Sequence, residues 1–267
     1  MSNVSALATL ARRRFALSAH TPREIVVPLL TPVLFAVVIA PALRDSFGGF
    51  HSSIDYLSFV ALGTVGLLVP LSTMFAGLGV IVDRENGAQR ELLAAPVPRS
   101  LLVLGNLTVA LTVAATQLVA LFGAALLRGA AFHVEASGVA WFGGAVLLFA
   151  VGTYGMAETL ASRVHSAEEY VGAVPAIAIV PWFFAGALFP IGVLPGALAV
   201  IAKLFPLTHA LALMRYGLVD RSGSGLHDIW NMGNTTMEAV LSLAVVALFA
   251  ALLTRVSIRA FTRSAVH

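Results

Sequence analysis

The chain has 267 residues, of which 59% are hydrophobic and 11% are charged, and its formal net charge is +3. A soluble domain carries about 25% charged residues, so a chain this apolar must expose much of its surface to lipid. Cysteine is absent, which excludes disulfides, thiolate metal sites and cysteine nucleophiles. The composition therefore predicts an all-α integral membrane protein, and so few charges make nucleic acid an unsuitable partner.

Residues 1–24 precede the first apolar run and carry apolar side chains at helical spacing. These are Val4, Leu7, Ala8, Ala11 and Phe15. Because Arg12 and Arg13 point away from this stripe, the pattern predicts a helix in the cytoplasmic interface, with a frayed basic tail as the alternative. The apolar run that begins near Ile25 lacks a small-residue cleavage site close behind it, so we expect a retained span rather than a signal peptide.

Six apolar stretches approach the length of about 20 residues that a helix needs to cross a bilayer. They cover residues 25–43, 56–82, 101–127, 139–161, 170–189 and 236–253. Residues 190–219 are also apolar, but prolines divide them into pieces of about ten residues, half the length of a span. Such pieces predict a re-entrant helical hairpin between spans five and six. The membrane domain then covers residues 25–255, and residues 256–267 form a basic cytoplasmic tail.

Lysine and arginine are unevenly divided between the two sides of these spans. Eleven lie in the two terminal segments and the loops 83–100 and 163–169, and five lie on the other side. Since positive residues are enriched in cytoplasmic loops, both termini are predicted to be cytoplasmic. The Ala, Val, Leu and Arg bias with scarce lysine points to the plasma (inner) membrane of a bacterium.

The chain lacks the residues that ATP hydrolysis requires. A phosphate-binding loop needs a lysine followed by Ser or Thr, whereas Leu204 follows the one lysine, Lys203. Histidines are scattered singly, and neither a His-Glu-x-x-His pair nor a Gly-x-Ser-x-Gly elbow is present. We therefore expect a chain that is not an enzyme and binds neither a metal nor a cofactor.

The most charged segment, residues 83–99, joins spans two and three. An acidic and arginine cluster is followed there by a glycine, a Glu-Leu-Leu run, prolines and an arginine. By charge alone this is an ordinary solvated loop, but its order resembles the signature of ABC-2 type exporter permeases. The matching positions are Arg84, Glu85, Gly87, Glu91, Leu92, Leu93, Pro96, Arg99 and Gly105. Asn106 departs from the family pattern, which often has lysine there.

The re-entrant stretch carries a second group of residues that resembles the same family. These residues are Phe189, Pro190, Leu194, Pro195, Pro206 and Arg215. In ABC-2 permeases the corresponding pattern forms two short re-entrant helices on the outer side of the membrane. The likeness is closest to the daunorubicin-type drug exporters.

The resemblance implies the membrane subunit of an ATP-driven exporter for a drug-like, lipid or amphiphilic substrate. Two copies of a separate ATP-binding subunit would hold ATP and Mg and dock on residues 83–99. The pathway would lie between two copies of this permease, or between this chain and a related one. Four glycines of span two allow close helix approach, either there or within the chain. These are Gly63, Gly66, Gly77 and Gly79.

Two other functions remain open, a proton- or ion-coupled carrier and a membrane-embedded enzyme or assembly factor without a transport role. A proton-coupled carrier would need a carboxylate deep in the membrane to bind the proton. Asp55, Glu158 and Glu238 all lie near predicted span ends, where we expect them to be solvated. The mid-span side chains of Thr116 and Gln117 are expected to pack against a neighbouring helix rather than line a path.

Overall fold

The structure of the chain is a computed structural model that describes residues 55–88 and 99–264, with side chains over 55–88 and 101–260. A few isolated positions before residue 43 are also described. The predicted interfacial helix (residues 1–24) and first span (residues 25–43) otherwise lie outside the described residues.

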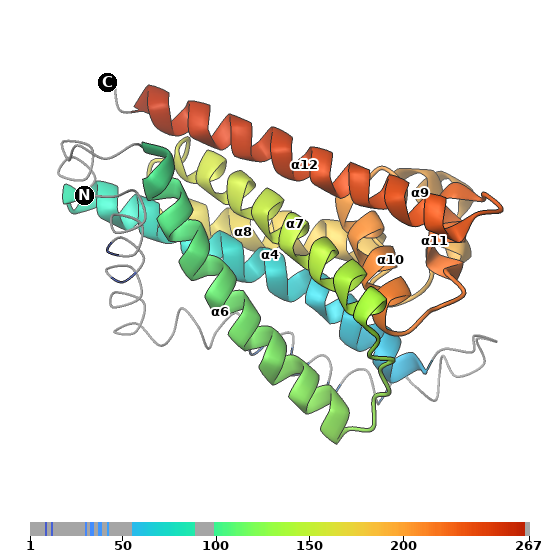
Figure 1. Cartoon of the computed structure of the whole chain (residues 1–267). Coiled ribbons are helices and arrows are strands. Elements are labelled where there is room, and N and C mark those ends of the chain that lie inside the picture. The colour runs from blue at the N-terminus through green and yellow to red at the C-terminus, as the bar shows by residue number, and fades with distance from the viewer. Residues whose placement is uncertain are drawn as a thin grey trace.

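The described residues form helices that run mostly alongside one another (Figure 1). In chain order they are α4 (Tyr56–Glu85), α6 (Arg99–Leu127), α7 (Ala136–Ala161), α8 (Ala167–Phe184), η2 (Ile191–Val193), α9 (Gly196–Ala202), α10 (Pro206–Leu218), α11 (Ser224–Trp230) and α12 (Thr235–Ser264). Within this part of the chain, five helices are long and apolar enough to cross a membrane, and α9 and α10 form a pair bent by 82°. The all-α membrane fold is therefore confirmed, and the bent pair lies where the re-entrant hairpin was predicted.

The two largest differences from the predicted boundaries are the ends of α8 and α12, each with a local reason. Helix α8 ends at Phe184, short of residue 189, because Gly186 adopts a φ of 78° and reverses the chain. Helix α12 continues to Ser264, past the predicted end at residue 253, since neither glycine nor proline interrupts it. Helix α11 lies between the re-entrant stretch and the sixth predicted span, where the sequence predicts no helix.

Helix α4 is the centre of the packing, because α6, α7, α8 and α10 all contact it and most of its residues are buried. Its first turn is capped by Asp55, whose carboxylate accepts a hydrogen bond from the Ser58 amide at 3.0 Å. Pro70 lies inside the helix, and Thr73 beside it donates to the carbonyls of Val69 and Pro70 at 2.9 and 3.1 Å. Side-chain donors thus supplement the backbone pairing around the proline.

Helix α8 is tied to α4 by two side chains that donate to α4 carbonyls. The Tyr170 hydroxyl bonds the Met74 carbonyl, and the Trp182 indole bonds the Gly63 carbonyl, both at 2.7 Å. A methyl group at Gly63 would overlap the Ala187 carbonyl, and one at Gly77 would overlap the Tyr170 hydroxyl. These two glycines therefore serve close packing within the chain.

Gly66 and Gln117 also pack within the chain. A methyl group at Gly66 would crowd Leu211 and Leu207 of α10. Gln117 is buried and accepts a hydrogen bond from the Ser72 hydroxyl, so its predicted packing role is confirmed. Thr116 is exposed, and its hydroxyl bonds the Thr112 carbonyl of its own helix.

Two of the three acidic residues near span ends are buried, so the expectation that they are solvated was wrong. Glu158 is 3% exposed and accepts a hydrogen bond from Tyr154. Glu238 is 0% exposed and accepts from the His227 ring nitrogen Nδ1 at 2.7 Å and from the Met232 amide at 2.6 Å. Asp55 caps α4, as described above. Donors on neighbouring residues offset part of the cost of removing both carboxylates from water, while the buried Oε2 atom of Glu238 has no donor among the described residues.

The crossing of α7 and α10 depends on a pair of glycines. A methyl group at Gly138 would overlap the Gly217 carbonyl, and one at Gly217 would overlap the Gly138 carbonyl. Gly138→Ala should therefore lower the free energy of unfolding in detergent by about 1–3 kcal/mol, the usual cost of overpacking. Gly143→Ala on α7 is the matched control, because nothing lies within 4 Å of a methyl group there. Equal stability of the two variants would contradict this packing.

Candidate functional site

The residues of the re-entrant motif position a chain reversal between α8 and α10. Pro190 precedes η2, Leu194 follows it, and Pro195 precedes α9. Pro206 is the first residue of α10. Prolines suit these positions, because the first residues of a helix have no intrahelical acceptor for their amide hydrogens. The prolines thus divide the apolar stretch into short helices.

Arg215 of α10 is the residue that fixes this reversal against α4. Its side chain is buried, and it donates to the carbonyls of Gly186 and Ala187 at 2.8 and 2.9 Å and to that of Phe59 at 3.3 Å. The guanidinium carbon also lies 3.4 Å from the centroid of the Phe59 ring. One cation thereby joins α10, the turn after α8 and the start of α4.

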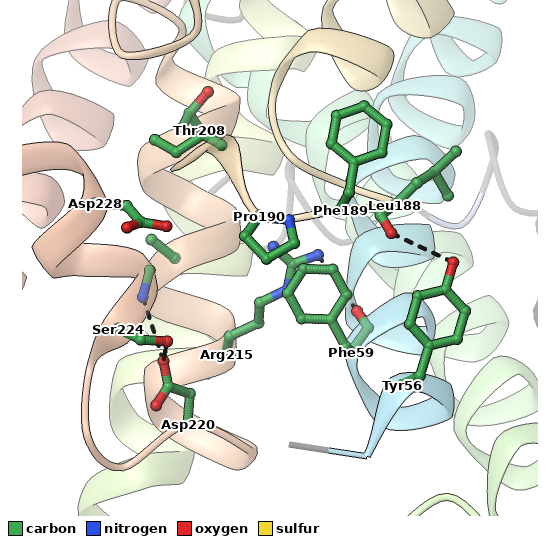
Figure 2. Close-up of a pocket in the computed structure, with 13 residues that line it drawn as sticks. Tyr56, Phe59, Leu188, Phe189, Pro190, Thr208, Arg215, Asp220, Ser224 and Asp228 are labelled. Carbon is green, nitrogen blue, oxygen red and sulfur yellow. Dashed lines mark hydrogen bonds between the residues drawn. The ribbon is translucent and has the colours of Figure 1, made fainter. Parts of the chain in front are cut away.

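A cavity of about 70 Å³ lies beside Arg215, between α4, α10, α11 and the segment after α8. Phe189, Pro190 and Arg215 of the motif line it together with Tyr56 and Phe59 of α4. Figure 2 shows these aromatic side chains of α4 on one side, and the polar side chains of α11 across from them. Apolar walls with a few convergent polar groups are typical of a ligand site.

The polar wall of the cavity was not predicted from the sequence. Asp220 is buried, and its carboxylate accepts from the hydroxyls of Ser222 and Ser224 at 2.6 and 2.7 Å. It also accepts from the amides of Gly223 and Gly225 at 3.1 and 3.3 Å, which places it over the start of α11. The Asp-Arg-Ser-Gly-Ser run is a capping pattern that could have indicated this helix.

Asp228 of α11 is the second carboxylate of the cavity, and it is half-buried. Burial raises the pKa of Asp228, while the Gly192 amide and the charge of Lys203 act in the opposite direction. Arg215 also keeps one buried donor, the Nε–H group, for which the described residues offer no acceptor. The cavity thus contains one cation and two carboxylates.

The first motif group lies at the opposite end of α4. Arg84, in the last turn of α4, donates to the carbonyls of Ala161 and Val164 at 3.1 and 2.7 Å. It therefore satisfies carbonyl groups at and just beyond the end of α7. Glu85 is exposed, and Gly87 adopts a φ of 75° in the turn that follows.

Part of this motif group lies beyond what the structure describes. Arg99 is the first residue of α6. Glu91, Leu92 and Pro96 fall outside the described residues. The described residues of the two motif groups are thus not brought together. They lie at the two ends of one 30-residue helix, which is about 45 Å long at a rise of 1.5 Å per residue.

Comparison with known proteins gives one family and two related permeases. A family model described as "ABC-2 type transporter" matches residues 5–219. A protein of Pyropia yezoensis named "Putative transport permease ycf38" is 27% identical over 197 residues, which cover 73% of this chain and 67% of that protein. The protein of the same name from Porphyra purpurea is 23% identical over 215 residues, covering 80% of this chain and 74% of its own length.

The contacts of Arg215 predict a large effect of a conservative change. Arg215→Lys keeps the charge but cannot reach three carbonyls in the same planar geometry. It should lower the free energy of unfolding in detergent by about 3 kcal/mol, because hydrogen bonds to a charged group contribute about 1.5–3 kcal/mol each. Arg221→Lys is the matched control, since Arg221 forms an exposed ion pair with Glu135 and should cost less than about 1 kcal/mol. Similar losses in both variants would contradict the role of Arg215.

Proposed function

Because this chain belongs to the ABC-2 type transporter family, we propose that it is the permease subunit of an ATP-driven exporter. A separate ATP-binding subunit, present in two copies with its ATP and Mg, would supply the energy that this chain has no phosphate-binding loop to provide. The substrate class that fits the apolar protein is a drug-like, lipid or otherwise amphiphilic molecule. The related permeases support a role in transport.

The observation that carries the proposal is the position of α4 between the two motif groups. Arg84 binds the end of α7 at one end of α4, and the Phe59 carbonyl and ring bind Arg215 at the other. A push on residues 83–99 by a closing ATPase pair would therefore move α4 and α7 together. The same movement would reach the re-entrant segment through Arg215.

The proposed orientation places the Arg84 end of α4 in the cytoplasm and the Arg215 end outside. The excess of lysine and arginine in the terminal segments and in loops 83–100 and 163–169 supports this orientation. Both termini would then be cytoplasmic, in the plasma membrane of a bacterium. The N-terminal interfacial helix would lie near the docking segment.

The substrate pathway would lie between two permeases, either two copies of this chain or this chain and a related one. The glycines of α4 at positions 63, 66 and 77 are already used inside the chain. A second copy would instead contact faces that remain open. Val180 and Phe183, three positions apart on α8, are exposed apolar side chains of this kind.

A proton-coupled carrier is the second candidate, because Glu158 and Glu238 are buried carboxylates. Transport in ATP-depleted vesicles under an imposed proton gradient would favour the carrier and contradict the exporter. A purified complex that contains this chain but no ATP-binding subunit would instead favour an assembly factor.

The docking role of residues 83–99 predicts that single carboxylates there hold the ATPase. Glu85→Ala or Glu91→Ala should reduce co-purification of the ATP-binding subunit several-fold while leaving membrane insertion intact. Glu135→Ala, on the opposite side of the membrane in the proposed orientation, is the control and should have no effect. Unchanged co-purification in both test variants would overturn the docking assignment.

Arg84 should affect coupling more than docking. Arg84→Ala removes the two hydrogen bonds to the end of α7, so substrate stimulation of ATP hydrolysis should fall by about tenfold, equivalent to one charged hydrogen bond of about 1.5 kcal/mol. The ATP-binding subunit should still co-purify. Arg163→Ala, at an exposed position in the loop after α7, is the control. Stimulation that survives in Arg84→Ala would show that the contact does not transmit motion.

A further inference from the structure

The cavity beside Arg215 has a net charge that its own residues do not balance. Asp220 and Asp228 carry two negative charges, and Arg215 carries one positive charge. Asp220 accepts hydrogen bonds from four donors of its own loop. Its negative charge offsets the positive charge of Arg215. Asp228 accepts a hydrogen bond from the Gly192 amide and lies within reach of the charge of Lys203, which does not line the cavity. Among the lining residues, Asp228 is then the carboxylate whose charge remains for a ligand, and its half-buried site screens that charge less than water would.

The wall opposite Asp228 suits an apolar body next to a cation. Tyr56, Phe59 and Phe189 contribute aromatic rings to the cavity, and Figure 2 shows Asp228 across from Tyr56 and Phe59. Aromatic rings attract cations as well as apolar groups. Arg215 already occupies one face of the Phe59 ring, so a ligand cation would meet Tyr56 or Phe189 instead.

One buried donor still needs an acceptor. The Arg215 side chain is 7% exposed, and its Nε–H group has no partner among the described residues. A buried donor left unsatisfied is unfavourable. Protein atoms enclose this group, so it adds no contact for a ligand, which would be bound by Asp228 and the aromatic wall.

We infer that this cavity binds an amphiphile through a protonated amine, with the ammonium group at Asp228 and the adjoining apolar body against the aromatic rings. The inference rests on the proposed function where it identifies this amphiphile as cargo. As a binding site, the cavity requires no ATP-binding subunit.

The absence of cysteine from the chain allows a direct test. Ser224→Cys places a single thiol in the cavity wall of the full-length chain, which is studied in lipid nanodiscs without an ATPase. Its reaction rates are measured with a trimethylammonium and with a sulfonate methanethiosulfonate reagent, each normalised to a free thiol. The cationic reagent should react faster. Asp228→Asn removes the negative charge and should lower the ratio of the cationic to the anionic reaction rate by about tenfold. One unit charge at several ångströms in water attracts the cationic reagent and repels the anionic one to similar degrees, so the two effects multiply in the ratio.

Two further variants keep this test decisive. Leu188→Cys provides a thiol on the opposite side of the cavity (Figure 2) if Ser224→Cys does not fold, because the Leu188 side chain makes no hydrogen bond. Glu135→Gln is the control, because Glu135 pairs with Arg221 and does not line this cavity. This variant should leave the ratio of reaction rates unchanged. A ratio near one, or a ratio that Asp228→Asn does not alter, would overturn the inference.

Ligand protection gives the second arm. Octylamine, protonated at pH 7, should slow labelling at concentrations where octanol does not, and Asp228→Asn should remove the difference. Equal protection by the two compounds would mean that the site recognises apolar bulk alone and would overturn the inference. In the complex with an ATP-binding subunit, octylamine should also stimulate ATP hydrolysis. If labelling is selective but no ATP-dependent activity is found, the cavity site is retained and the exporter is rejected. If ATP-dependent activity is found but labelling is not selective, the exporter is retained and the cavity site is rejected.

Discussion

The buried guanidinium of Arg215 holds together three segments that are far apart in the chain. It donates to carbonyls of the turn after α8 and of α4, and it lies against the Phe59 ring. A charge removed from water is stable only when donors and acceptors around it are well placed. The reversal after Phe184, the position of α10 and the shape of the neighbouring cavity all depend on this set of contacts.

The same constraint governs the polar groups elsewhere in the core. Backbone carbonyls of α4 receive hydrogen bonds from Tyr170 and Trp182 of α8. Glu238 is buried at the start of α12 and is held by His227 and Met232. In a bilayer, polar groups must find partners inside the protein. The polar side chains therefore fix which helices are neighbours, whereas apolar packing alone would allow several arrangements.

Helix α4 physically connects the two motif groups. A helix whose backbone is fully hydrogen-bonded moves as a unit, and most of this one is enclosed by four neighbours. Arg84 links one end to α7, and Phe59 links the other to Arg215. In the proposed exporter, this arrangement would connect the docking segment to the outer cavity without a separate relay of side chains.

Composition and hydrophobic length were sufficient to determine the membrane class, the approximate spans and the broken segment between residues 190 and 219, because the bilayer limits both composition and helix length. The order of residues around Arg84 and Arg215 was sufficient to indicate the family. Tertiary structure alone decided that Glu158 and Glu238 are buried, since burial depends on which helices surround a span end. It also decided that Asp220 and Asp228 share a cavity with Arg215 and the aromatic rings of α4. That site joins residues more than 150 positions apart, and no local pattern in a sequence specifies contacts between such distant segments.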